Sequence, residues 1–190
     1  TVREHDRILF NGNGYDEAWV REAGRRGLLN LRTTPECLPH LLSEKNVRVF
    51  EEMKVFSLTE LKARHDIMMD QYAKEVKVEA ITMLDMIRKD ILPAVSRFTG
   101  KLVDAALHKK ELLGEDSICY EAAVCRRLSE LEKKAWEAAG RLDEAAEETS
   151  ACCDAVSAAK LCACRILPLM EELRGVSDEM ECIVDKRYWP

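Results

Sequence analysis

The sequence predicts an all-α fold, with short helices and loops at the N-terminal end followed by an elongated antiparallel bundle of long helices. Two observations lead to this prediction. The chain has only 8 Gly and 5 Pro, and from Ser57 onward its pattern is almost wholly helical. In two long stretches beyond Gly114, apolar residues recur about every 3.4 residues, closer to the ~3.5 of a helical stripe than to the 2 of a strand.

Composition and charge exclude several classes of protein. Hydrophobic residues make up 47% of the 190 residues and charged residues 34%, which is a normal globular balance and not that of a disordered or collagen-like chain. The net charge of -6 argues against nucleic acid and anionic membranes as partners. No apolar run reaches the ~18 residues of a spanning helix. The first residue is Thr1, and we interpret the chain as a piece of a longer protein.

We expect two regions, a base of loops and short helices over residues 1–60 and a long-helix bundle over 61–190. The base opens with the apolar run Ile8-Leu9-Phe10, and a turn over residues 11–14 follows. Asp16 is a candidate N-cap for a short helix that ends at Gly27. The apolar positions of this helix are Trp19, Val20 and Ala23.

The rest of the base is predicted to be a loop and a second short helix. The loop is marked by Thr33, Thr34, Pro35 and Pro39. Ser43 can then cap a helix whose apolar residues are Val47, Val49 and Phe50.

The first long helix is predicted to begin at a capping box. Ser57-Leu58-Thr59-Glu60 places Ser at the N-cap and Glu three residues later, so the two side chains satisfy each other's backbone N–H groups. Pro93 lies within the helical stretch that follows, and we expect a kink near Ile91. The apolar positions are Leu61, Ile67, Met68 and Tyr72, followed by Ala80, Met83, Ile87, Ile91, Phe98 and Leu102.

Breaks near 114 and 149 divide the rest of the bundle. Gly114 ends one helix, and Thr149-Ser150 is the expected turn between the last two. A helix over residues 115–148 would be about 50 Å long. Its stripe is Ile118, Ala122, Cys125, Leu128, Leu131, Ala135, Ala138, Leu142 and Ala145. That of the last helix, which contains Pro168, is Val156, Ala159, Cys162, Ile166, Leu169, Leu173, Val176, Met180 and Ile183.

The cysteines favour a reducing, cytoplasmic location. Seven of the eight lie in helical sequence without the spacing of a disulfide scaffold, and we expect small, reduced, buried thiols. Cys162 and Cys164 are two residues apart on a helix, so they point in different directions and cannot hold one metal ion together. The eight are Cys37, Cys119, Cys125, Cys152, Cys153, Cys162, Cys164 and Cys182.

No catalytic or metal site is recognisable in these residues. The four histidines are scattered, and the acidic residues between Glu130 and Glu148 alternate with Lys and Arg, as on a solvated helix face. The one glycine-rich stretch is Asn11-Gly12-Asn13-Gly14. It is either a structural turn, which its composition favours, or a weak anion site whose backbone N–H groups contact a phosphate. Trp136, beside the stripe of its helix, is a candidate contact to a partner.

Several segments together resemble the C-terminal part of type III glutamine synthetase, the long-chain bacterial form. The resemblance is dense over residues 8–98 and returns at the C-terminal end. The segments are Ile8 to Tyr15, Trp19, Arg26-Gly27-Leu28, Asn30-Leu31, Thr33-Thr34, Leu38-Pro39, Ser43 to Asn46, Val55-Phe56, Glu60-Leu61, Glu79-Ala80, Thr82-Met83, Ile91 to Val95, Val184 to Lys186 and Tyr188-Trp189-Pro190.

The resemblance implies a parent enzyme that makes glutamine from glutamate, ammonia and ATP with Mg or Mn ions. It places the metal ligands and phosphate-binding arginines in a catalytic barrel upstream of residue 1, so this segment carries no cofactor itself. The implied partners are that upstream domain and further copies of the chain, in a double hexameric ring. The segment would then serve architecture or oligomerisation and be inactive alone. The alternative is a stand-alone helical-bundle interaction scaffold.

Overall fold

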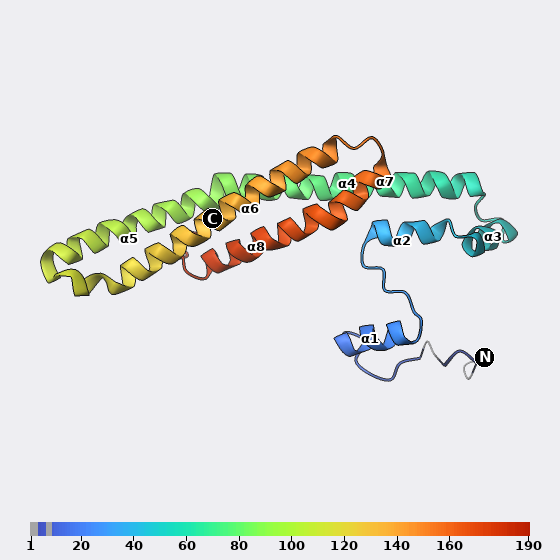
Figure 1. Ribbon diagram of the computed structural model, residues 1–190, viewed down its shortest axis with the longest axis horizontal. Coiled ribbons are helices and arrows are strands. Elements are labelled where there is room, and N and C mark those ends of the chain that lie inside the picture. Colours follow the sequence, from blue (N-terminus) through green and yellow to red (C-terminus); the bar gives the residue numbers. More distant parts are fainter. Residues whose placement is uncertain (1–3, 7–8) are drawn as a thin grey trace. The chain divides into compact units, whose positions relative to one another are not determined.

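The computed structural model describes residues 4–6 and 9–190, and within that part of the chain every regular element is a helix. Ile8, in the predicted apolar run, lies outside the described residues. The chain forms two compact units, residues 1–65 and residues 66–190 (Figure 1). None of the helices in the described part is long and apolar enough to cross a membrane. The all-α prediction is confirmed for the described residues.

The first α-helix of the first unit is α1 (Glu17–Arg25), and its ends have the caps that the sequence predicts. The Asp16 side chain accepts a hydrogen bond from the backbone N–H of Ala18 at 2.8 Å. At the other end Gly27 has a φ of 75°, the left-handed conformation that glycine adopts most easily after a helix. Local sequence therefore determines both ends of this helix.

The predicted loop around Thr33 is wrong, because these residues form the helix α2 (Thr34–Leu41). The Glu36 carboxylate accepts hydrogen bonds from the backbone N–H groups of Arg32 (2.8 Å) and Thr33 (3.1 Å). Pro35 stands in the first turn, where its missing N–H has no helical partner to lose. The proline that favoured a loop is thus a helix-start residue. The next helix, α3 (Glu44–Glu52), follows Ser43 as predicted.

One helical path runs from Leu58 to Leu113, through α4 (Leu58–Met86), the π-helical turn η3 (Ile87–Ile91) and α5 (Leu92–Leu113). The capping box at its start is confirmed, since Ser57 N–H and Oγ each lie 2.8 Å from Glu60 Oε2. Near Ile91, where a kink is expected, the structure has the π-helical turn η3. The Leu92 N–H bonds to Ile87 O, five residues back, just before Pro93, which has no N–H.

The buried face of α4 is predicted only in part. Leu61 and Ala80 are buried as expected, but Ile67 and Met68 are exposed, by 64% and 46%. The buried positions lie three or four residues apart, as in any helix with one packed face. They are Met69, Ala73, Val76, Ala80 and Leu84, continued by Ile87 and Ile91.

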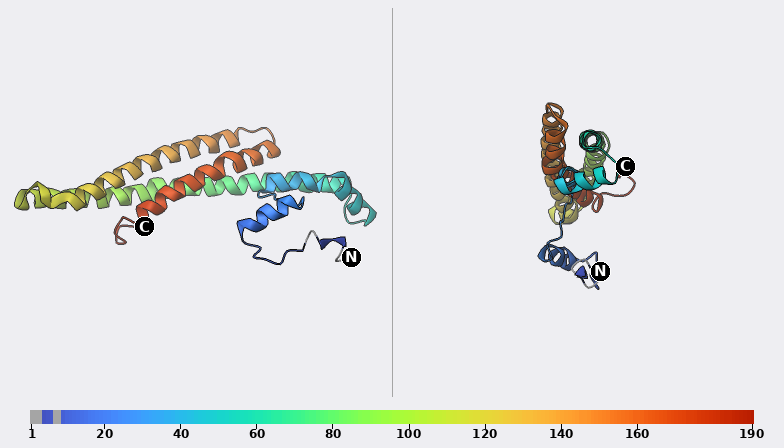
Figure 2. Two further views of the ribbon diagram at one scale, coloured as in Figure 1. Left: turned by 60° about the horizontal axis from the view of Figure 1, so that its bottom comes forward. Right: turned by 90° about the vertical axis from the view of Figure 1, so that its right-hand side faces the viewer.

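The second unit is completed by η4 (Glu115–Ile118), α6 (Cys119–Ser150), α7 (Ala155–Leu161), the π turn η5 (Cys162–Ile166) and α8 (Leu167–Glu181). In both figures α6 runs beside α5 and α8, antiparallel to each (Figures 1 and 2). The 32 residues of α6 give a length of about 48 Å, close to the predicted 50 Å. Gly114, with a φ of 86°, ends α5 as predicted.

The expected turn at Thr149 and Ser150 lies further along the chain. Both hydroxyls donate to carbonyls four residues back, Ala145 O and Ala146 O, at 2.8 Å, so both residues remain helical. The turn follows at residues 151–154. Asp154 then caps α7 by accepting from Ser157 N–H at 2.8 Å. This Asp is the helix-start signal that sequence reasoning missed.

The core of the second unit lies along α6 and α8. Most of the predicted stripe is inaccessible to solvent, including Leu128, Leu131 and Leu142 on α6 and Ile166, Leu173 and Met180 after the turn. Ion pairs also connect the helices at the surface. Among them are Arg88–Asp143 (2.7 Å), Arg141–Glu172 (2.5 Å), Arg127–Glu179 and Arg165–Glu148. Such exposed pairs each contribute at most about 1 kcal/mol, so apolar packing dominates.

The expectation of buried cysteines is largely wrong. All eight are free thiols, but only Cys162 is buried, where its Sγ lies 3.7 Å from Ala73 O of α4. Cys125 and Cys152 are half-buried and the others are exposed.

Candidate functional site

The turn over residues 11–14 is exposed, and side-chain oxygens take the backbone N–H groups next to it. Asn13 Oδ1 accepts from Tyr15 N–H at 3.1 Å, and Asn13 O accepts from Asp16 N–H at 3.2 Å. The Asp16 carboxylate accepts a hydrogen bond from the backbone N–H of Ala18 in the first turn of α1. An anion here would have to displace these acceptors and approach a carboxylate, which favours the structural interpretation of the turn.

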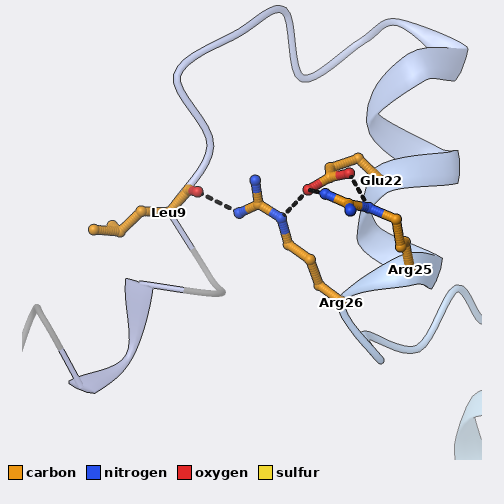
Figure 3. A network of polar contacts seen from close by, with 4 residues as sticks. All are labelled: Leu9, Glu22, Arg25 and Arg26. Atoms are coloured by element: carbon orange, nitrogen blue, oxygen red, sulfur yellow. Dashed lines mark hydrogen bonds and ion pairs between the residues drawn. The ribbon is translucent and has the colours of Figure 1, made fainter.

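Arg26, which bonds to the segment before this turn, has all of its described partners within the first unit (Figure 3). Arg26 Nη1 donates to Leu9 O at 2.5 Å, and Arg26 Nε contacts Glu22 Oε1 at 2.5 Å. Arg25 donates to the other Glu22 oxygen at 2.8 Å. The guanidinium of Arg26 also lies 5.8 Å from the ring centroid of Trp19. The network connects the segment before the turn to the end of α1.

Glu22 is the electrostatic centre of this network. Hydrogen bonds from Arg25, and then from Arg26, lower the pKa of its carboxyl from 4.5 to about 2. The carboxylate is therefore ionised over the whole physiological range, and it offsets one of the two guanidinium charges beside it.

Gly12 has a packing role in the turn. A Cβ at this position would lie 2.5 Å from the Phe10 ring, whereas a Cβ at Gly14 would meet nothing within 4 Å. The Phe10 ring in turn stacks on Trp19, with centroids 4.3 Å apart. The first glycine of the motif is thus required by an aromatic contact, which the sequence alone did not indicate.

The other candidate groups do not converge on a reaction centre. Among the described residues no three His, Cys, Asp or Glu side chains are grouped so that they could hold a metal ion. The acidic residues of α6 are mostly exposed and several pair with Lys or Arg, for example Glu130 with Arg127 at 3.4 Å. Cys162 is buried and Cys164 exposed, so the two point apart as predicted. Trp136 is 64% exposed, as a partner contact would require.

A groove that sequence reasoning missed lies in the second unit, between α4–η3 and α8. Its volume is about 510 Å³. The apolar lining comes from both helical segments and includes Met83, Met86, Ile87, Ile91, Met170 and Leu173. A sequence signal was present, because Ile-Leu-Pro occurs both at 91–93 and at 166–168, where in each case the Ile is the last residue of a π turn. Each π turn interrupts the regular α-helical hydrogen bonding of a helix beside the groove.

A family model described as the glutamine synthetase C-terminal domain matches residues 1–110. Over 188 residues the chain is 32% identical to a protein of Butyrivibrio fibrisolvens named glutamine synthetase, covering 99% of this chain and 27% of that protein. Over 194 residues it is 31% identical to a type-3 glutamine synthetase of Dictyostelium discoideum, covering 100% and 26%.

A glutamine synthetase of Bacteroides fragilis is also similar, at 25% identity over 197 residues, with 96% of this chain and 26% of that protein covered. The chain spans about a quarter of the length of these relatives. The alignments with the relatives extend beyond residue 110, so the similarity includes α6 and α8 as well as the segment that the family model matches.

Proposed function

The chain belongs to the glutamine synthetase C-terminal domain family, and we propose from this that it is the C-terminal helical domain of a type-3 glutamine synthetase. The complete enzyme would make glutamine from glutamate, ammonia and ATP. The observation that supports this most is the combination of the family match over residues 1–110 with relatives aligned to nearly all of this chain and to only a quarter of their own.

The chemistry of such an enzyme calls for groups that these residues do not bring together. Phosphorylating glutamate and adding ammonia to the acyl phosphate requires carboxylates for divalent metal ions and arginines for phosphate charge. The described residues do not fit this requirement. They contain no group of ligands for a metal, and Glu22, Asp143 and Glu172 are paired with arginines. ATP and Mg or Mn would therefore bind in the remaining three quarters of the complete enzyme.

For this segment itself we propose an architectural role. The second unit has a continuous core, and residues 1–60 would pack on the catalytic barrel of the same chain. Further copies of the chain would join it in the double hexameric ring that the family resemblance implies. The free thiols are consistent with a cytoplasmic enzyme.

A deletion in the complete enzyme tests this role. Removing residues 100–180 should lower the number of chains in the assembly, obtained from its light-scattering mass divided by the mass of the truncated chain, and lower its melting temperature, because most of the α6 and α8 core is lost. An unchanged assembly with unchanged stability would contradict the architectural role. The isolated 190 residues should form no glutamine.

The alternative function is a stand-alone helical interaction scaffold. The exposed Trp136 and the exposed leucines at the end of α5, Leu112 and Leu113, favour contacts with another protein. A scaffold has no need of glutamine-forming activity in its complete chain, so a glutamine assay on that chain separates the two.

A further inference from the structure

The groove between α4–η3 and α8 has an apolar floor and adaptable walls. Ile87, Ile91 and Leu173 on its floor are exposed by only 2%, 8% and 0%. The walls carry three methionines, of which Met86 is 52% exposed. Methionine is unbranched and polarisable, and grooves lined by it accept apolar side chains of varied shape. A 510 Å³ apolar groove on a protein surface is a typical binding feature.

The length of the groove matches a short helix. Its α4–η3 wall extends from Val78 to Ile91. At 1.5 Å per residue this is about 20 Å, or three to four helical turns. Helices bind such grooves through apolar residues at i, i+3, i+4 and i+7. The occupant that fits best is therefore an amphipathic helix.

The charges at the edge of the groove define the polar side of that helix. Glu79 on α4 and Glu171 on α8 are exposed, and neither has an ion-pair partner in the described part of the chain. Asp178 faces Arg174 at 3.7 Å, so this pair adds little net charge. The edge is acidic overall, and a bound helix with Lys or Arg beside its apolar stripe would complement it.

The comparisons indicate where such a helix could come from. The whole α4–η3 wall lies inside residues 1–110, which the family model matches. The α8 wall lies beyond residue 110, in the part of the chain that aligns with the relatives. The relatives have about three quarters of their length outside the matched region. That length is available to supply a partner helix.

We propose that the groove binds an amphipathic helix with a basic flank from the catalytic part of the same longer chain. This rests on the proposed function, because it requires that longer chain. The groove then anchors the long-helix unit to the catalytic part, and the π turn before Pro93 shapes the surface that receives the helix. Its chemistry is apolar contact at Met83, Met86 and Met170, with ion pairs at Glu79 and Glu171.

Methionine oxidation in the complete chain tests the proposal. Hydrogen peroxide converts accessible methionine to the sulfoxide, and Met68 is a matched reference on the same helix, outside the groove and 46% exposed. We expect Met86 to react at least about tenfold more slowly than Met68 in the native chain and equally fast in urea. Equal native rates would overturn the proposal. Protection that disappears on dilution would mean that a second copy fills the groove, which would also overturn it.

A charge reversal tests the basic flank. Glu79→Lys should remove most of the protection of Met86, while Glu75→Lys, exposed on the same helix but outside the groove, should leave it unchanged. Equal protection in both variants would overturn the assignment of a basic flank. Glutamine formation measured on the same samples separates the two hypotheses. An active chain with an unprotected Met86 refutes the docking alone, whereas an inactive chain refutes the proposed function.

Discussion

The two compact units are stabilised in different ways. In the first unit, few of the described apolar residues are buried; they are Ala23, Pro35, Leu38 and Leu61. Its helices depend on caps, on the Phe10–Trp19 stack and on the Glu22 network. In the second unit, a continuous apolar core joins helices far apart in sequence. Caps and short-range contacts can therefore define short helices, whereas the long helices depend on packing against one another.

The largest effect is expected from a cavity in the core of the second unit. Leu131 and Leu142 are completely buried, so Leu131→Ala or Leu142→Ala should lower the free energy of unfolding by about 2–5 kcal/mol. Leu112→Ala is the control, because Leu112 is 82% exposed and its loss should cost less than about 0.5 kcal/mol. Urea unfolding followed by far-UV circular dichroism measures both. Equal effects would mean that α6 is not the core.

A smaller effect is expected in the first unit, at the glycine turn. Gly12→Ala places a Cβ against the Phe10 ring and should destabilise the turn by about 1–3 kcal/mol, as overpacking does. Gly14→Ala meets no atom within 4 Å and should be close to neutral. The NMR signal of the Trp19 indole N–H reports on the stack in both variants. A shift in the second variant and none in the first would contradict this packing.

The pH dependence of the first unit is expected at acidic pH. The pKa of Glu22 falls from 4.5 to about 2 on folding, so its stabilising contribution is complete above pH 4.5. It should be lost as the pH falls from 4.5 towards 2. Carboxyl chemical shifts should show the low midpoint, and Arg25→Ala should raise it more than Arg26→Ala, because Arg25 is the larger cause. A midpoint near 4.5 in the unmodified chain would contradict the network.

The smallest perturbation compares two cysteines of the second unit. Burial raises the pKa of the Cys162 thiol, whereas Cys164 is exposed two residues away. Iodoacetamide should therefore modify Cys164 at least about tenfold faster than Cys162 in the native state. Mass spectrometry of the two labelled positions gives the ratio. Equal rates in the native state would show that η5 does not bury Cys162.

Sequence patterns predicted the parts of the fold that depend on one kind of local signal. The caps at Asp16 and Ser57 and the break at Gly114 fall where expected, since each satisfies backbone groups next to it in sequence. The helix α2 was missed because Pro35 was interpreted as a loop residue, although a proline in a first turn starts helices equally well.

Packing between helices determines which face of α4 is buried, and the periodicity of its sequence does not. Apolar residues occur on more than one side of α4, so the sequence did not reveal that Met69 and Ala73 face the core and Ile67 faces solvent. The same holds for the sites. The roles of Gly12 and the groove depend on a ring and on a second helix that lie elsewhere, and no pattern within one segment records such neighbours.

The intact mass and activity of the native polypeptide test most directly whether these residues belong to a longer enzyme. Mass spectrometry of the polypeptide purified from its source should give about four times the 21.7 kDa of these residues. The same sample should make glutamine from glutamate, ammonia and ATP. A native chain of about 21.7 kDa that forms no glutamine would contradict the account and leave the scaffold in its place.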